Sequence, residues 1–400
     1  MTTHTCEETA TTGGMVAFLA LAAALGTSTT YLLQPALADV AGALRTDLGA
    51  IGLALAWGPV GYLVGLVLLV PLVDRYRPDR LLAAAFAVLA ATLLLTAVVG
   101  DVVVLGATVF VTGALSAVGA AISSLAARIA PAGRRATVLG VVTAGIAGGI
   151  LAGRIAGGWL SEQVGWRGML VLVALATGLV AAGCLLQLPA RAGAGGPGLL
   201  AGLRALPGLF VRHRALRVAA VRGAAWFFAF CALWAGLAVA LSAPPYSLSA
   251  DRIGLYALAG LSGIAATRVA GAWTDRVGAR PVILAGLVLA GLAAALSALA
   301  LDSMPAVLVC LAAVDAGLFA AQVANQSTVL AIDPAAPARF NSAYMAVYFV
   351  GGSLGTACGA VVAERYGWPS VALLVTAAIG LAAVLSATRP SSAVPREAGR

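Results

Sequence analysis

Three ionisable residues, Arg154, Arg268 and Asp315, stand inside long apolar stretches of the sequence. A charged side chain within a membrane helix is costly, so the first interpretation of such residues is functional. A carboxylate can take up and release a proton, and a guanidinium can bind a carboxylate or another anion. Arg268 is about two turns from a polar loop and can extend its side chain to the membrane surface, so a structural role is equally open for it. Asp315 is the one carboxylate deep in an apolar stretch, which makes it the candidate proton carrier.

The composition requires that most of the chain face lipid. Of its 400 residues, 62% are hydrophobic and 10% are charged, and the mean hydropathy is +1.02. A soluble domain carries roughly 25% charged residues. Backbone polar groups in lipid must be satisfied internally, which leaves helices or a closed barrel. Because the apolar stretches run about 20 residues without period-2 alternation, they predict an all-α membrane protein.

Twelve membrane-spanning helices are expected, joined mostly by short connections. The stretch 190–219, rich in Gly and Arg, is longer and divides the chain near its midpoint. The sequence therefore predicts a six-helix bundle over 1–189, a cytoplasmic linker over 190–219 and a second six-helix bundle over 220–400. The expected helices lie at roughly 15–37, 49–72, 81–100, 102–125, 136–160, 168–189, 220–243, 253–273, 281–301, 305–330, 341–363 and 369–388.

Arginine placement predicts the orientation of the chain. Every basic residue among the 24 is an arginine; one set of alternate connections and tails carries 18 of them, the other set carries four, and two lie within helices. By the positive-inside rule the arginine-rich side is cytoplasmic, so both termini are expected on the cytoplasmic side of the plasma membrane. Because these arginines stand in short gaps between apolar stretches, they indicate orientation and not nucleic-acid binding. The rich set is Arg75, Arg77, Arg80, Arg128, Arg134, Arg135, Arg191, Arg204, Arg212, Arg214, Arg217, Arg222, Arg276, Arg280, Arg339, Arg389, Arg396 and Arg400.

The two halves of the chain repeat at an offset of about 202 residues. Five short matches occur in the same order in both halves, which chance rarely produces. They are Ile51-Gly52 with Ile253-Gly254, Asp74-Arg75 with Asp275-Arg276, Pro131 with Pro334, Gly148-Gly149 with Gly351-Gly352, and Gly165-Trp166 with Gly367-Trp368. Parallel repeats of this kind occur in transporters whose halves rock about a site near the bilayer midplane.

A charged motif follows the second and the eighth expected helices. After the eighth helix it consists of Gly271, Asp275, Arg276, Gly278 and Arg280; after the second, Asp74 and Arg75 are kept and the glycines are not. The motif resembles the cytoplasmic loop signature of the major facilitator superfamily, G-x-x-x-D-R-x-G-R-R, and the expected twelve helices resemble that family's fold. A carboxylate can bind the N-terminus of a neighbouring helix, and arginines can pair with acceptors across a loop. We therefore expect the motif to latch one conformation; plain orienting charge is the alternative.

Glycines recur along the fifth expected helix, at Gly140, Gly149, Gly153, Gly157 and Gly158. Their spacing resembles the antiporter motif of drug–proton exporters in the major facilitator superfamily, with Arg154 where that motif has proline. The resemblance implies a proton-coupled exporter. Ordinary close packing of small residues in a membrane helix is the alternative interpretation.

The family resemblance also implies that the fifth and tenth helices approach each other across the interface between the halves. Counted from the same membrane side, Arg154 and Asp315 differ in depth by roughly 6 Å at 1.5 Å per residue, which a long side chain can bridge. The pair is therefore the candidate proton-coupling site. Separate contacts of each residue with water or backbone are the alternative.

Uncharged polar and aromatic residues form the expected substrate cavity. They are Tyr31, Gln34, Trp234, Gln322, Asn325, Gln326, Tyr344 and Tyr348, joined by an aromatic stripe through Trp226 and Phe230. Such a stripe can equally serve packing, whereas clustered amides need polar partners within the membrane. A mostly apolar cavity with few fixed charges suits a neutral or lipophilic cationic small molecule better than a phosphate or a dicarboxylate.

These features favour a proton-coupled exporter of small amphipathic molecules working by alternating access. A major facilitator importer or facilitator of a small metabolite is the second hypothesis. A membrane enzyme or sensor is the third; the sequence shows neither a nucleophile–base or metal cluster nor a phosphate-binding glycine loop for it. We expect protons, a small-molecule substrate and the lipid bilayer as partners, no cofactor, metal or nucleic acid, and a monomer. The sequence leaves open the substrate, the direction of transport and the coupling ion.

Overall fold

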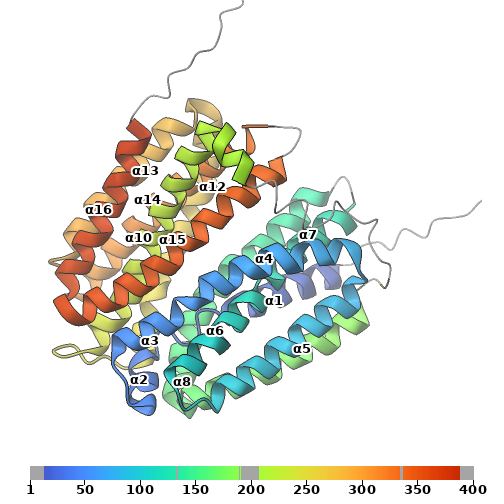
Figure 1. The fold of residues 1–400 in the computed structure, drawn as a ribbon, viewed down its shortest axis with the longest axis horizontal. Helices are drawn as coiled ribbons and strands as arrows, with labels where there is room; N and C mark the ends of the chain where they lie inside the picture. The colour runs from blue at the N-terminus through green and yellow to red at the C-terminus, as the bar shows by residue number, and fades with distance from the viewer. Residues whose placement is uncertain (1–12, 132–133, 189, 191–206, 334–336, 388–400) are drawn as a thin grey trace, which may run out of the picture. The chain divides into compact units, whose positions relative to one another are not determined.

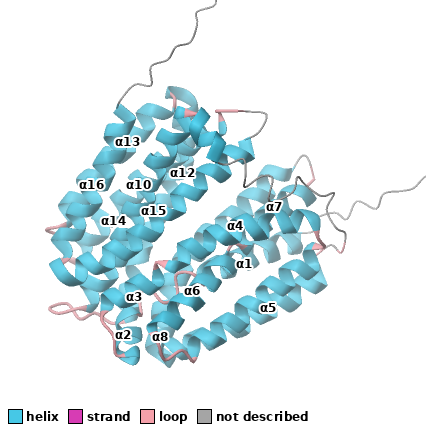
Figure 2. Cartoon of the chain, viewed as in Figure 1, coloured by secondary structure: helices cyan, strands magenta, loops and turns pink. Residues whose placement is uncertain are grey.

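The computed structural model describes residues 13–131, 134–188, 190, 207–333 and 337–387. Within these ranges every regular element is a helix and no strand occurs (Figure 2). Most of the predicted linker, residues 191–206, lies outside the described residues. The rest of it is largely helical, because residues 207–212 form a short helix and the next helix begins at Arg214.

The chain divides into two compact units. Unit 1 comprises Met1–Leu199 and Leu241–Ala257, and unit 2 comprises Leu200–Ala240 and Leu258–Arg400. Unit 1 contains α1 (Gly13–Ser28), α2 (Leu37–Leu44), α3 (Leu48–Leu55), α4 (Trp57–Arg75), α5 (Pro78–Ala97), α6 (Val102–Ser116), α7 (Val118–Ile129), α8 (Arg135–Gln187) and α11 (Ala250–Leu255) (Figure 1). Unit 2 contains most of α10 (Arg214–Ser242), then α12 (Gly260–Val277), α13 (Ala279–Ser297), α14 (Met304–Leu330), α15 (Pro337–Tyr366) and α16 (Trp368–Ala387); the 3-10 helix η2 (Tyr256–Ala259) crosses the boundary.

Ten helical stretches in the described residues are long and apolar enough to cross a membrane. One of them, Thr137–Gln187, spans 51 residues and turns sharply at Gly165, whose φ is 75°. A left-handed φ is open to glycine at little cost, and Gly367, with φ 76°, turns the chain in the same way between α15 and α16. With the two halves of α8 counted separately and the shorter apolar α1 included, the expected all-α membrane fold of twelve helices is confirmed.

Four expected spans are interrupted. The first, expected over 15–37, ends as α1 at Ser28 and continues as turns over residues 29–36. The second divides into α3 and α4 at Ala56, and the eighth divides into α11, η2 and α12 over residues 256–259. These two breaks are about one repeat offset apart, so the repeat extends to local backbone geometry. The fourth span divides into α6 and α7 at Ala117. Hydropathy does not report such breaks, because the residues on both sides are equally apolar.

Large apolar side chains fill the interior of unit 1. Leu19 of α1, Phe86 of α5 and Leu125 of α7 are fully buried in one continuous cluster. Asp47 and Asp101 cap the N-termini of α3 and α6 by accepting hydrogen bonds from backbone N–H groups of the first turn. Packing within the unit therefore fixes α1 and α8; Arg154 lies on α8, and Tyr31 and Gln34 lie in the turns that follow α1.

Candidate functional site

A seam of glycines joins α8 to α1 in unit 1. Gly145, Gly149, Gly153 and Gly157 follow one another at intervals of four and so lie on one face of α8. A Cβ added at any of them would overlap a backbone carbonyl of α1 or of the turn that follows it, from Ala20, Ala24, Ser28 and Leu32 in turn. Three of these glycines belong to the predicted antiporter-like motif. The motif's other members differ, because Gly140 has open space around it and Gly158 packs against Ala250 of α11.

Unit 2 repeats this seam between α15 and α10. A Cβ at Gly351, Gly355 or Gly359 would overlap the backbone carbonyl of Ala224, Phe228 or Ala232. The α15 glycines stand 202 residues after Gly149, Gly153 and Gly157, and their α10 partners stand 200 residues after the α1 partners. The glycine spacing is thus a packing device of both units. Arg154, beside Gly153, is the feature that distinguishes α8.

Arg154 lies in a polar cluster within unit 1. Its side chain is buried, 5% exposed. Its Nε donates to Oε1 of Gln34 at 2.7 Å, and its Cζ lies 4.8 Å from the ring centroid of Tyr31. The amide oxygen and the aromatic face both stabilise the cation. The structure therefore brings together three residues that the sequence singles out separately, and we call Tyr31, Gln34 and Arg154 the Arg154 cluster.

Asp315 lies on α14 in unit 2 and is 1% exposed. One turn before it, the Ala312 carbonyl accepts a hydrogen bond of 2.7 Å from Ser262 of α12. One turn after it, Phe319 packs edge-on against Trp226 of α10, with ring centroids 5.6 Å apart. Asp315 is therefore held on a helix whose neighbouring turns are fixed by two other helices. The predicted pairing with Arg154 joins the two units and stays a prediction.

The predicted amides of α14 enter a network that also contains Arg222 of α10. Arg222 Nε donates to Oδ1 of Asn325 at 2.7 Å, and its NH1 donates to Ser386 of α16 at 3.3 Å. The Asn325 amide nitrogen donates to the Ala219 carbonyl and to the Tyr344 hydroxyl, which in turn donates to Gln322 at 2.7 Å. Tyr344 is fully buried and Asn325 is 2% exposed. This Arg222 network, defined by Arg222, Gln322, Asn325, Tyr344 and Ser386, ties α10, α14, α15 and α16 together inside unit 2.

Sequence reasoning misses Arg222 and Ser386 as members of that network. It places Arg222 among the orienting arginines, because the seventh helix is expected to begin at residue 220. Arg222 would then lie in the first turn of that helix, next to the arginine-rich linker. In the structure α10 begins at Arg214, so Arg222 lies more than two turns inside the helix. Gln326 stands apart from the network, because its amide donates to Asn341 at 3.0 Å.

An aromatic cluster occupies the neighbouring part of unit 2. Tyr348 of α15 stacks on Phe227 of α10 at 4.1 Å between ring centroids, and Phe230 packs edge-on against Phe319 at 5.7 Å. The Trp226 indole N–H donates to the Leu318 carbonyl. Trp234, a predicted cavity residue, lies one turn beyond Phe230 and is buried. These rings form a buried apolar cluster within the unit, with Asp315 one turn from Phe319.

The loop motif divides between capping and exposed positions. Gly278 takes φ 85° between α12 and α13, which explains the glycine of the motif. Arg280 donates to the carbonyls of Ser386, at 3.1 Å, and Ala387, at the C-terminal end of α16. Asp275 and Arg276 are exposed, as is Arg75; the side chain of Asp74 lies outside the described part, and Gly271 has open space around it.

The geometry defines a polytopic helical protein whose two units repeat one packing scheme and carry charged groups inside apolar helices. A family model described as Major Facilitator Superfamily matches residues 17–267 and 226–400. The probable transporter SCO4007 of Streptomyces coelicolor is 34% identical over 379 residues, which cover 93% of this chain and 87% of that protein. The uncharacterized transporter YgaY of Escherichia coli O157:H7 is 28% identical over 362 residues, covering 90% of this chain and 91% of that protein.

Solved structures show the same fold at low sequence identity. A mutant form of the nucleoside transporter NupG has a TM-score of 0.71 at 15% identity and covers 92% of this chain and 98% of its own. An inward-facing bacterial homolog of the human lysosomal transporter Spinster has a TM-score of 0.73 at 14% identity and covers 93% of this chain and 95% of its own. The chain belongs to the major facilitator superfamily and is a multi-pass membrane transporter.

Proposed function

We propose that the protein is a proton-coupled exporter of small amphipathic molecules that works by alternating access. The observation that carries the proposal is Asp315, a carboxylate 1% exposed within a membrane-spanning helix. A charged side chain in such a place is costly, so a carboxylate there is a functional candidate. A group of this kind can bind a proton in one conformation and release it in another.

Arg154 is the proposed cation of that cycle. In unit 1 it contacts the amide oxygen of Gln34 and the aromatic face of Tyr31. Approach of Arg154 to Asp315 in one conformation would favour release of the proton, and separation would favour its uptake. Substrate and proton would then use alternate states of one conformational cycle.

The substrate class follows from the surfaces offered by unit 2. The aromatic cluster around Trp226 gives apolar and π surface, and the carboxylate of Asp315 stands one turn from it. Such surfaces suit a lipophilic molecule that is neutral or singly cationic. The resemblance of α8 to the antiporter motif supports export. The arginine distribution supports a plasma-membrane location with both termini cytoplasmic.

A major facilitator importer or facilitator of a small metabolite is the alternative function. The solved relatives with this fold include a nucleoside transporter, and the glycine seam recurs in unit 2, so packing alone does not favour export. The dependence of transport on a proton gradient separates the two. An exporter accumulates its substrate in everted vesicles when the lumen is acidified, whereas a facilitator only equalises it.

The test uses everted vesicles with an imposed proton gradient and a panel of fluorescent lipophilic cations and neutral dyes. Wild-type protein should accumulate at least one of these compounds. Asp315→Asn should abolish the accumulation and retain passive exchange of the same compound. Asp302→Asn, which alters an exposed carboxylate in the loop before α14, is the matched control and should behave as wild type. Accumulation at the wild-type level by Asp315→Asn would rule out Asp315 as the carrier.

A further inference from the structure

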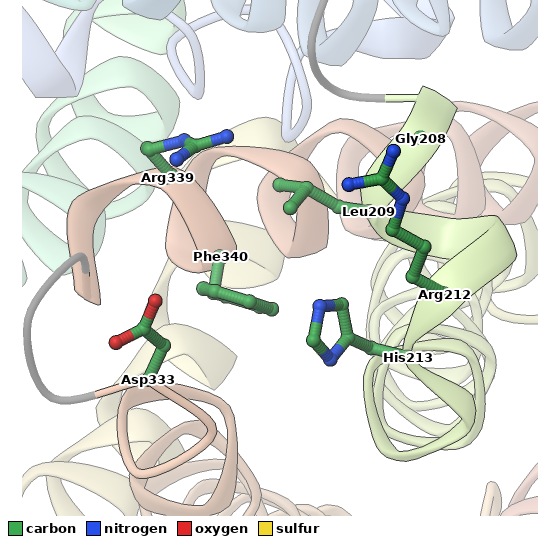
Figure 3. Close-up of a pocket in the computed structure, with 7 residues that line it drawn as sticks. All are labelled: Gly208, Leu209, Arg212, His213, Asp333, Arg339 and Phe340. Carbon is green, nitrogen blue, oxygen red and sulfur yellow. The ribbon is translucent and has the colours of Figure 1, made fainter.

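A cavity of about 410 Å³ lies in unit 2, just beyond the C-terminal end of α14. It is bounded by the short helix 207–212, by the residue that joins this helix to α10, and by the residues around the start of α15 (Figure 3). The lining residues are Gly208, Leu209, Arg212, His213, Asp333, Arg339 and Phe340. None of them belongs to the proposed coupling pair, the proposed substrate site or the family motifs.

Two guanidinium groups face this cavity. Figure 3 shows Arg212 and Arg339 reaching the side of the cavity where Leu209 lies, from opposite directions. Both residues are exposed, and neither donates a hydrogen bond to a protein acceptor among the described residues. Nearby, Arg217 is already engaged, because its NH1 donates to the carbonyls of Phe210 and Val211. Arg212 and Arg339 are therefore available to a ligand.

The opposite wall of the cavity is aromatic. The ring of His213 packs edge-on against Phe340, with centroids 4.9 Å apart, and Phe340 is buried. This contact fixes the imidazole at the cavity wall, where it can supply one further donor. Leu209, on the side of the two arginines, is buried. The cavity thus combines cationic donors with apolar surface, and Figure 3 shows the carboxylate of Asp333 across Phe340 from His213.

We propose that this cavity binds a phosphate-bearing anion with a short apolar part, either the headgroup of an anionic phospholipid or a soluble phosphate ester. Arginine forks match phosphate oxygens in geometry, and two of them balance a phosphate better than a single carboxylate. Basic pockets beside membrane helices are a known means of holding lipid headgroups. A bound phosphate would join the helix 207–212 to the first turn of α15.

The experiment measures binding to the purified full-length chain of two probes, phosphatidylglycerol and glycerol 3-phosphate, with phosphatidylcholine as the neutral comparison. Native mass spectrometry counts bound lipid, and thermal unfolding reports the stabilisation by either probe. Wild-type protein should bind at least one anionic probe in preference to phosphatidylcholine. The double variant Arg212→Gln/Arg339→Gln should bind that probe at least about tenfold more weakly, because both charged donors are removed.

Two controls fix the interpretation. Arg80→Gln/Arg214→Gln removes two exposed arginines outside the cavity and should change affinity by less than about twofold. Asp333→Asn removes the one acidic group of the lining and should tighten anion binding. Since Arg212 and Arg339 are exposed, the single variants Arg212→Gln and Arg339→Gln should fold and each should weaken binding in part.

The outcomes distinguish the two sources of phosphate and decide whether the proposal stands. Binding of phosphatidylglycerol alone assigns the site to lipid, and binding of glycerol 3-phosphate assigns it to a soluble ester; both support the proposal. Equal binding by wild type and Arg212→Gln/Arg339→Gln overturns it, as does weaker anion binding by Asp333→Asn. Failure of both phosphatidylglycerol and glycerol 3-phosphate to bind in preference to phosphatidylcholine also overturns it.

Discussion

In unit 1, α8 packs on α1 through glycines, and in unit 2, α15 packs on α10 through glycines at the corresponding positions. The residues beside the two seams differ. At the positions of Arg154, Gln34 and Tyr31 in unit 1, the repeat offsets place Thr356, Trp234 and Cys231 in unit 2. Thr356 donates to the carbonyl of Gly352 in its own helix, so it adds no charge to the seam. Unit 1 therefore has a polar, charged site where unit 2 has a neutral one.

The Arg222 network shows the reverse difference. At the positions of Arg222, Asn325 and Tyr344, unit 1 has Ala22, Ser123 and Val142. Ala22 and Val142 are buried apolar residues, and Ser123 donates to the carbonyl of Gly119 in its own helix. Both units thus share the glycine seam. Each has a buried polar cluster at positions where the other unit has none. Transport is expected to depend on the Arg154 cluster, and stability on the shared seam and on the Arg222 network.

Filling the seam should have the largest effect of the changes considered. Gly149→Val places a branched side chain against the Ala24 carbonyl, which is backbone and cannot rotate away. We expect the free energy of unfolding to fall by roughly 3 kcal/mol, at the upper end for overpacking, and Tm to fall by about 10 °C. Fluorescence-detected size-exclusion chromatography after heating measures it.

Valine substitutions at a neighbouring position and at the corresponding position of unit 2 are the controls. Gly148→Val adds the same side chain one residue away, where nothing lies within 4 Å, and should leave Tm almost unchanged. Gly355→Val in unit 2 should match Gly149→Val, because it meets the Phe228 carbonyl. Equal losses from Gly148→Val and Gly149→Val would show that the seam is not what limits stability.

Replacing Arg154 by the residue of unit 2 should have the next largest effect, on transport. Arg154→Thr removes the buried cation and leaves Gln34 and Tyr31 without it. We expect gradient-driven accumulation in everted vesicles to fall at least about tenfold, which corresponds to about 1.4 kcal/mol of lost coupling. The counterpart Thr356→Val should change the initial rate by less than about twofold, because its hydroxyl binds only its own helix. A tenfold loss of the initial rate of transport in Thr356→Val would contradict the proposal that the two units differ in function at this position.

Hydropathy and the repeat predict the helices, because a membrane span needs a long apolar stretch and the two halves diverged from one pattern. The glycines of the fifth expected helix also suggest close packing of that helix, since close approach of two backbones tolerates no side chain. Hydropathy and the repeat misplace Arg222, because the polar end of a helix and a polar loop look alike in sequence. The pattern makes Arg222 an orienting charge, whereas α10 extends back to Arg214.

Tertiary partners are the part that the sequence does not supply. Gln34 and Arg154 are 120 residues apart, and Arg222 and Ser386 are 164 apart, so only packing reveals that they meet. The Arg154 cluster contains three residues selected for separate reasons. In the Arg222 network, by contrast, the amides that suggest a substrate cavity are largely occupied by Tyr344 and Arg222.

Loss of one hydroxyl from the Arg222 network should have a moderate effect on stability. Tyr344→Phe removes the donor to Gln322 and the acceptor for Asn325 inside the unit. We expect the free energy of unfolding to fall by about 1–2 kcal/mol and Tm to fall by about 3–6 °C. Tyr366→Phe, at a tyrosine that is 69% exposed, is the control and should not lower Tm. A wild-type Tm for Tyr344→Phe together with a changed substrate affinity would instead place Tyr344 in the substrate site.

The smallest expected effect concerns Arg280, which tests the loop motif. Arg280 binds the last carbonyls of α16, and unit 1 has a similar contact in which Arg128 of α7 donates to the Val73 carbonyl of α4 at 2.9 Å. An arginine at a helix C-terminus contributes about 0.3–1 kcal/mol. Arg280→Gln should therefore lower Tm by about 2 °C and leave the rate of transport unchanged.

Asp275→Asn provides the contrasting variant. Asp275 is exposed on the same motif, so its replacement should change the free energy of unfolding by less than about 0.5 kcal/mol. Under the latch hypothesis it should slow transport about two- to fivefold while equilibrium substrate affinity stays the same, because the carboxylate acts in one conformation only. A slowed Arg280→Gln with unchanged Tm would move Arg280 from capping to the latch. A large loss of substrate affinity in Asp275→Asn would contradict the latch, since a group that only biases switching between conformations has no contact with substrate to lose.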